Sequence, residues 1–260
     1  MMKQVLIVAI ALVSASAATL RADDKAEEVQ KKIHEKLSKY KSLSFKSVTI
    51  LESDSPESSS RATTDQACEF LRKDAKTVLS RFENKSHSTT KIGDQQTKYE
   101  SSTTMLYDGE FQYRLIDNMG KKIASKDRPF PGSMVDPFDI LPQFRAMDKT
   151  HRVRLLPDDK VGGKAVWVME ISAKTPASRP AGSKGESAGE RTVNSYDKDT
   201  GVLIKSISYD SGGKPSSTTT MSDIKVDDKI DPERFKFKAP EGVPMFDRTQ
   251  GKTPPAEPKK

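Results

Sequence analysis

Short apolar runs separated by turn signals recur along most of this chain. Between Asn194 and Asp247, two such runs flank Asp197-Lys198-Asp199-Thr200-Gly201, and the second ends at Asp210-Ser211-Gly212-Gly213. Asp and Gly tolerate the positive φ of tight turns, so these runs predict consecutive antiparallel strands. The pattern predicts about eleven strands in all and therefore a mainly β protein. The expected strands lie near residues 43–52, 66–73, 77–86, 97–107, 110–117, 121–126, 150–157, 164–174, 191–197, 202–210 and 215–226.

The segment from Ala22 to Leu43 has helical periodicity instead. Asp23 or Asp24 can cap its start, and lysines occupy its expected last turn. Apolar residues recur at spacings of four, four and three, which predicts a helix with one face packed on the sheet. This apolar stripe consists of Val29, Ile33, Leu37 and Tyr40.

The segment from Met134 to Met147 is the second helix candidate. Asp136-Pro137 is a plausible start, because proline is favoured in the first turn of a helix. Phe138, Leu141 and Phe144 follow at a spacing of three residues, which places them on one helical face.

One domain is expected, over residues 23–247, because no linker-like segment divides the chain. The polar stretches Ser53–Asp65 and Thr175–Glu190 lie between strand-like segments and are expected to be surface loops. Residues 248–260, rich in proline and charge, are expected to be disordered. Apolar residues make up only 34% of the chain, which favours one curved sheet with a wetted face over a two-sided α/β core.

Residues 1–22 have the pattern of a secretory signal peptide. Met1-Met2-Lys3 precedes the apolar run Val5–Val13, which is followed by small residues. The run is shorter than the roughly 20 residues that span a membrane, so a soluble, exported, periplasmic protein is expected. The candidate cleavage sites follow Ala17, Ala18 and Ala22.

Cys68 is the single cysteine of the chain. It lies far from the cleavage sites, which excludes N-terminal lipidation, and it has no partner for an intramolecular disulfide. Its strand-like neighbours predict a packing thiol rather than a reactive one.

The C-terminal segment and one hairpin resemble the outer-membrane lipoprotein carrier family, the LolA family. Asp231 to Val243 is similar to the family's closing pattern D-x-x-x-F-x-F-x-x-P-x-G-V, and Tyr107 to Tyr113 is similar to its D-G-K-x-x-W-x-Y hairpin. The resemblance implies an incomplete antiparallel β-barrel closed by two helices, with a hydrophobic cavity for the acyl chains of lipoproteins or lipids. It also implies transfer toward the outer membrane between an inner-membrane release protein and an outer-membrane acceptor.

The chain departs from this family after the second strand. The family often has K-R-P there, with an arginine implicated in gating the cavity, whereas this chain has Arg72-Lys73-Asp74. By the resemblance, Lys73 is the candidate for the position of that arginine. The family also tends to have more tryptophan than the lone Trp167.

Alternate residues of the expected strands, together with the second helix, are the candidates for lining such a cavity. A packed core without a ligand is the alternative interpretation of the same pattern. The candidate lipid-binding residues are Phe70, Lys73, Phe82, Phe111, Tyr113, Leu115, Phe138, Leu141, Phe144, Trp167, Met169 and Ile171, with Met147 beside them on the second helix.

Catalytic and metal-binding patterns are weak. Gly185-Glu186-Ser187-Ala188-Gly189 matches G-x-S-x-G, but it lies in a polar loop with no helix pattern after it, and no histidine follows it. Residues Asp197 to Gly201 resemble the start of a calcium loop, yet the twelfth position is Ser208 rather than a carboxylate. The three histidines, His34, His87 and His151, lack metal-ligand spacing. We therefore expect a non-enzymatic protein without cofactor or metal.

The basic charge does not favour nucleic acid as the partner. The precursor carries a formal charge of +7, and removal of residues 1–22, with Lys3 and Arg21, leaves +5 spread over the chain. A periplasmic, monomeric lipoprotein or lipid carrier is the favoured function. The alternative is an envelope lipid-sensing or protein-interaction module on the same fold.

Overall fold

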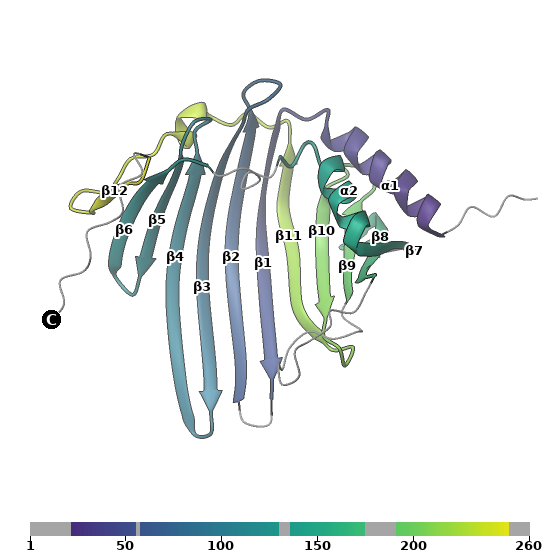
Figure 1. The fold of residues 1–260 in the computed structure, drawn as a ribbon, viewed down its shortest axis with the longest axis horizontal. Helices are drawn as coiled ribbons and strands as arrows, with labels where there is room; N and C mark the ends of the chain where they lie inside the picture. The colour runs from purple at the N-terminus through teal and green to yellow at the C-terminus, as the bar shows by residue number, and fades with distance from the viewer. Residues whose placement is uncertain (1–21, 56–57, 130–135, 175–190, 250–260) are drawn as a thin grey trace, which may run out of the picture.

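The computed structural model describes residues 22–55, 58–129, 136–174 and 191–249, and its strands form one twelve-stranded sheet (Figure 1). The order across the sheet is β12-β6-β5-β4-β3-β2-β1-β11-β10-β9-β8-β7. All neighbouring strands are antiparallel except β12 and β6. The strands are β1 (Ser42–Asp54), β2 (Ser58–Arg72), β3 (Val78–Ile92), β4 (Gln95–Tyr107), β5 (Gln112–Asn118), β6 (Lys121–Asp127), β7 (His151–Val161), β8 (Lys164–Ala173), β9 (Arg191–Asp197), β10 (Leu203–Tyr209), β11 (Pro215–Val226) and β12 (Met245–Asp247).

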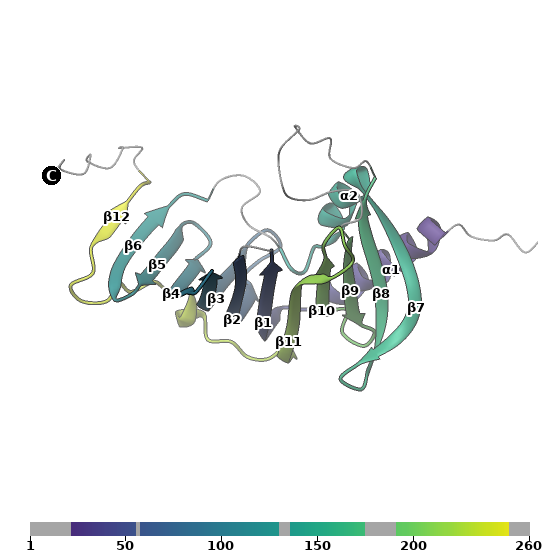
Figure 2. The ribbon, with the colours of Figure 1, turned by 90° about the horizontal axis from the view of Figure 1, so that it is seen from below.

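The sheet is curved but open, and two helices lie on its concave side (Figure 2). These are α1 (Ala22–Leu37) and α2 (Leu141–Thr150), which contact each other and β7. The expected fold class, a mainly β and largely antiparallel curved sheet with two helices, is confirmed. The sheet does not close because its two edges, β7 and β12, lie at opposite ends of the molecule (Figure 1).

The main hydrophobic core lies between the helices and the sheet. Val29, Ile33 and Leu37 of the predicted stripe are 5%, 0% and 4% exposed and pack in one cluster with residues of five strands. Because the stripe repeats every three to four residues, it forms one continuous apolar face over β1, β2 and the β7–β9 region. The strand members of this cluster include Leu43, Phe70, Val153, Met169 and Tyr196.

The β9–β10 hairpin holds α1 at close range. Its turn closes with the Gly201 N–H donating to the Asp197 carbonyl, and Gly201 has a φ of +76°. A Cβ at position 201 would lie 3.1 Å from the Ile33 carbonyl oxygen, so glycine is required both for the turn and for the approach of the helix. This confirms the first hairpin turn expected from the sequence.

The C-terminal segment crosses the convex side of the sheet as a strap, defined here as residues 227–247. It begins beside β1, where the Ser42 hydroxyl donates to the Asp228 carbonyl at 2.6 Å. The 3-10 helix η1 (Pro232–Phe235) contacts β3, and β12 then pairs in parallel with β6 (Figures 1 and 2). The strap therefore links the middle of the sheet to its far edge.

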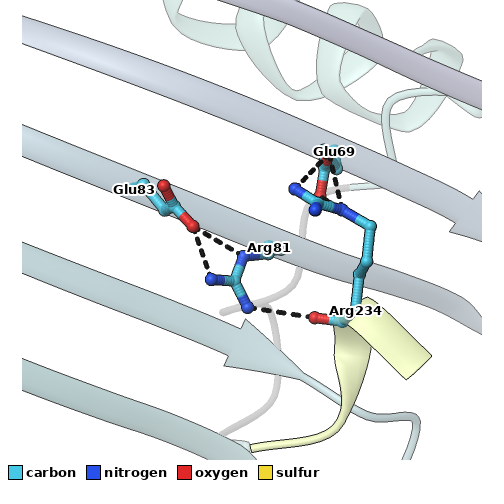
Figure 3. A network of polar contacts seen from close by, with 4 residues as sticks. All are labelled: Glu69, Arg81, Glu83 and Arg234. Carbon is cyan, nitrogen blue, oxygen red and sulfur yellow. Dashed lines mark hydrogen bonds and ion pairs between the residues drawn. The ribbon is translucent and has the colours of Figure 1, made fainter. Parts of the chain in front are cut away.

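Two side chains anchor the strap. Phe235 is 1% exposed, and Phe237 stacks on Tyr113 of β5 with the ring centroids 5.1 Å apart. Polar contacts surround η1: Arg234 pairs with Glu69 of β2, and Arg81 of β3 donates to the Arg234 carbonyl (Figure 3). Phe235 and Phe237, the alternating phenylalanines near the C-terminus, thus pack against the convex side of the sheet.

Several expected boundaries are wrong. The described residues between 53 and 65 are mostly strand rather than loop: β1 continues to Asp54, and β2 begins at Ser58. The Ser- and Thr-rich ends of these two strands pair with each other through the backbone without any apolar alternation. Helix α1 ends at Leu37 rather than residue 43. Helix α2 begins at Leu141 rather than near Asp136, because Pro142 provides the N-terminal proline. Strand β12 was not expected.

Other expectations fall outside the described residues. These are the signal peptide through residue 21, the loop 175–190 with Ser187, and the tail from residue 250 onward.

Candidate functional site: the concave face of β1 to β4

The strand registers divide the residues of β1 to β4 between two faces. Alternate residues point to opposite faces, and the pairing of these four strands is continuous. Leu43 and Phe70, which pack beneath the helices, define the concave face. The concave positions are the odd-numbered residues from 43 to 53 on β1 and from 95 to 107 on β4. On β2 and β3 they are the even-numbered residues, from 58 to 72 and from 78 to 92.

Charge is almost absent from this concave face. On these four strands, all of which the structure describes, Arg72 is its one charged residue. The convex face of the same strands has twelve: Lys46, Glu52, Asp54, Arg61, Asp65, Glu69, Arg81, Glu83, Lys85, Lys91, Lys98 and Glu100. A sheet face that meets water usually carries charged residues, as the convex face of these four strands does. The concave face of the same strands does not have this composition.

Aromatic side chains form the apolar end of this face. Phe70 lies between Phe45 and Phe82, with ring centroids 6.2 Å and 5.3 Å away. Phe70 is buried, whereas Phe45 and Phe82 are only partly buried where they meet the core. Leu141 of α2 and Trp167 of β8 are partly buried at the same cluster. These partly buried groups form the apolar surface at this end of the concave face.

A belt of small hydrogen-bonding side chains crosses the concave face next to the aromatic end. Successive registers place eight such residues in one row over eight strands. Two neighbouring pairs are bonded, Thr49 to Thr219 and Thr64 to Ser86, each with 2.9 Å between hydroxyl oxygens. The row is Asn118, Ser101, Ser86, Thr64, Thr49, Thr219, Ser206 and Asn194.

The belt ends at a buried polar pair on β9, of which Tyr196 packs against α2. Asn194 is 9% exposed and donates to the Tyr196 hydroxyl at 3.4 Å, while its Oδ1 has no hydrogen-bond partner. Burial raises the pKa of Tyr196 to about 12, so its hydroxyl stays protonated. The Tyr196 ring packs edge-on against Phe144 of α2. An unsatisfied buried acceptor such as Asn194 Oδ1 is uncommon.

The charged exception, Arg72, is the last residue of β2 and lies two positions beyond Phe70. Its guanidinium carbon is 4.9 Å from the centre of the Phe138 ring, and Phe138 is fully buried. Its Nε and Nη2 atoms are buried and have no hydrogen-bond partner. Arg72 thus faces the concave side, beside the segment that leads into α2.

The structure brings together most of the predicted lipid-binding residues. Phe138, Phe144, Met169 and Ile171 are buried in the main core with Phe70, while Phe82, Leu141, Met147 and Trp167 lie partly buried around it. Phe138 belongs to the turn before α2 rather than to the helix itself.

Four predicted residues do not join this group. Tyr113 and Leu115 of β5 point to the convex side, where Tyr113 stacks on the strap. Phe111 precedes β5 and lies under the Lys126 ammonium, with Nζ 3.7 Å from the ring centre. Lys73, the candidate for the gating position by resemblance, is exposed one residue past the end of β2.

Sequence reasoning missed Phe45 and Arg72. Phe45 stood within an expected strand, and its alternation with Leu43 was the signal that places it on the buried face. Arg72 was passed over for its neighbour. Strand alternation alone would have selected it, because it shares parity with Cys68 and Phe70.

The remaining candidate groups are dispersed. His34 is on α1, where its Nδ1 lies 3.6 Å from Asp139 Oδ1, His87 is on β3, and His151 begins β7. Among the residues with described positions, no group of three or more His, Cys, Asp or Glu side chains is arranged to hold a metal ion. Asp197 accepts from the Asp199 N–H and from Lys164 Nζ, as a turn carboxylate does. Within the described ranges, no helix has the length and apolar character to cross a membrane.

Comparisons with known proteins give similarity at the level of solved structures. No family model matches the sequence, and no curated protein matches it. The crystal structure of MucB matches with a TM-score of 0.47 and 11% identity over 83% of this chain and 63% of that chain. An uncharacterized conserved protein from Thermus thermophilus gives 0.45 and 10%, over 86% and 99% of the two chains. A putative outer membrane lipoprotein-sorting protein domain from Vibrio parahaemolyticus gives 0.35 and 13%, over 82% and 97%. The chain spans just over three fifths of the MucB structure that it matches.

Proposed function

We propose that this protein is a carrier that binds the acyl chain of a lipid or lipoprotein on its concave face. The observation that carries the proposal is the distribution of charge on β1 to β4, with one charged residue on the concave side and twelve on the convex side. A ligand that excludes water from a surface is tolerated only where no charge is desolvated without a partner. The concave face meets this condition over four long strands.

The concave face also has the two surfaces that an amphiphile needs. Partly exposed Phe45, Phe82 and Trp167 supply apolar contact near the helices. The adjoining belt of small hydrogen-bonding side chains supplies hydrogen bonds without charge. Each buried methylene contributes about 0.8 kcal/mol, so a sixteen-carbon chain gains on the order of 10 kcal/mol before ordering costs. This gain suffices to extract a chain from a membrane or from a partner.

Leu141 and Met147 place α2 at the boundary of this surface, since both contact the core while remaining partly exposed. Entry of an acyl chain beneath α2 would displace these two side chains. The N-terminal sequence pattern supports export, and we propose the periplasm as the place of transfer. An inner-membrane release protein and an outer-membrane acceptor are the corresponding partners.

Acyl binding is tested by titrating the protein with palmitate and following the fluorescence of Trp167, the single tryptophan. Phe82→Ser removes a concave aromatic, and Val48→Ser makes a similar change on the convex face of β1, where Val48 is 38% exposed. We expect saturable binding that Phe82→Ser weakens about tenfold and Val48→Ser leaves unchanged. Circular dichroism should show that both variants keep the sheet.

The outcome that rejects a carrier is defined by the wild-type protein. Absence of any saturable change with fatty acids and lipopeptides, together with no lipid in native mass spectra, would leave the interaction-module alternative. Equal weakening by both variants would place the binding surface elsewhere.

A further inference from the structure

Arg72 differs from the arginines of the convex face in having an empty hydrogen-bonding edge. Arg81 directs its Nε and Nη2 atoms to Glu83, and Arg234 directs the same two atoms to Glu69 (Figure 3). In Arg72 these two atoms are buried without any hydrogen-bond partner. Among the described residues, no carboxylate accepts a hydrogen bond from this edge of Arg72.

Leaving this edge empty is unfavourable in the protein as it stands. Buried N–H donors of a permanently charged guanidinium have lost water and gained nothing in return. The Phe138 ring, whose centre is 4.9 Å from the guanidinium carbon, attracts the positive charge but cannot accept two hydrogen bonds from the Nε and Nη2 edge. Oxyanions accept bidentate hydrogen bonds from this edge in a planar geometry.

We infer that Arg72 binds the oxyanion of an acyl ligand, a carboxylate or phosphate, whose hydrocarbon chain lies along the concave face. This inference rests on the proposed function and specifies its ligand as an anionic amphiphile. Arg72 lies at the concave end of β2, two and four positions beyond Phe70 and Cys68 on the same face. An anion at Arg72 therefore starts a chain over apolar and uncharged side chains alone.

The first experiment compares ligands on the wild-type protein. Calorimetric titration would use palmitate, its methyl ester and hexadecyl phosphate, each with the same sixteen-carbon chain, and inorganic phosphate and acetate alone. We expect each anionic amphiphile to bind tenfold to a hundredfold more tightly than the ester, on the order of a charged hydrogen-bonded pair. Whichever of the two anions binds more tightly identifies the headgroup class. Inorganic phosphate that binds as tightly as hexadecyl phosphate would overturn the assignment to a lipid headgroup.

The second experiment assigns the preference to Arg72. Arg72→Gln should remove the difference between palmitate and its ester, while Arg72→Lys should keep part of it through charge without the planar fork. Lys73→Gln is the matched control, since it removes one positive charge from the adjacent exposed residue and should leave the preference intact. Urea unfolding should confirm that each variant is folded. If Arg72→Gln does not fold, Arg72→Lys and the wild-type comparison still decide the matter.

The outcomes separate this inference from the proposed function. Equal binding of palmitate and its ester by the wild-type protein would overturn the role of Arg72 and leave acyl binding standing. Equal loss of both ligands in Arg72→Gln would show that Arg72 supports packing and would also overturn the role. If no acyl compound binds, the proposed function fails, and the inference fails with it.

Discussion

Replacement of Phe235 by alanine should strongly destabilise the protein, because this side chain anchors the strap to the convex face. Phe235 is 1% exposed within η1, which contacts β3. Truncation of a fully buried phenylalanine costs about 3–5 kcal/mol, whereas the whole stability of a typical domain is about 5–15 kcal/mol. We therefore expect the melting temperature to fall by roughly 6–20 °C for a chain of this size.

Urea unfolding followed by far-ultraviolet circular dichroism and Trp167 fluorescence measures this loss. Phe246→Ala is the matched control, because Phe246 belongs to the same segment but is 40% exposed and should cost less than about 1 kcal/mol. A similar small loss in both variants would refute the reasoning. The reasoning would also be refuted if Phe235→Ala kept the wild-type unfolding midpoint while proteases cut its strap rapidly. The sheet would then be stable without the strap.

Two further predictions concern buried polar groups. Cys68 is 2% exposed, and burial raises the pKa of its thiol to about 12; thiol reagents at pH 8 should therefore react only after urea unfolds the protein, and rapid labelling of the native state would contradict this. The pKa of Asp197 is lowered overall: burial opposes ionisation, but hydrogen bonds from the Asp199 N–H and Lys164 outweigh it. The depressed pKa makes its stabilisation present above the unfolded value of 3.8 and lost as the pH falls below it. Asp197→Asn should therefore flatten the acid limb of a stability-versus-pH curve, and an unchanged slope would exclude this contribution.

The strands were predictable because their signals are local. The β9–β10 turn and the alternation on each strand depend on neighbouring residues, and the apolar stripe of α1 depends on helical spacing alone. The extent of β1 and β2 was not, because their Ser- and Thr-rich ends carry no apolar alternation. Their pairing depends on each other, which a local pattern does not record.

The assignment of faces was harder to predict than the strands. Alternation groups Tyr113 with Leu115 but does not say which side of the sheet the pair occupies. The strap decides it, since Phe237 lies more than a hundred residues away in sequence and covers the convex side. The same rule explains why Arg72, and not the predicted Lys73, carries the charge on the concave face. A shift of one residue along a strand reverses the face to which a side chain points.

The concave face extends well beyond the residues that α1 and α2 bury. Leu51, Ile92 and Tyr99 all lie on it and are 46%, 62% and 41% exposed. A packed core explains uncharged residues only where other elements cover them, and nothing in the described part of the chain buries these three. Exposed positions without a binding role are free to accept Lys or Glu, as the convex positions of the same strands do. On β1 to β4 charge is avoided even at concave positions that meet solvent, whereas the neighbouring strands β5 and β6 carry Arg114, Lys121 and Asp127 on the same face. The concave face of β1 to β4 is therefore the part whose composition fits the ligand-covered surface proposed above.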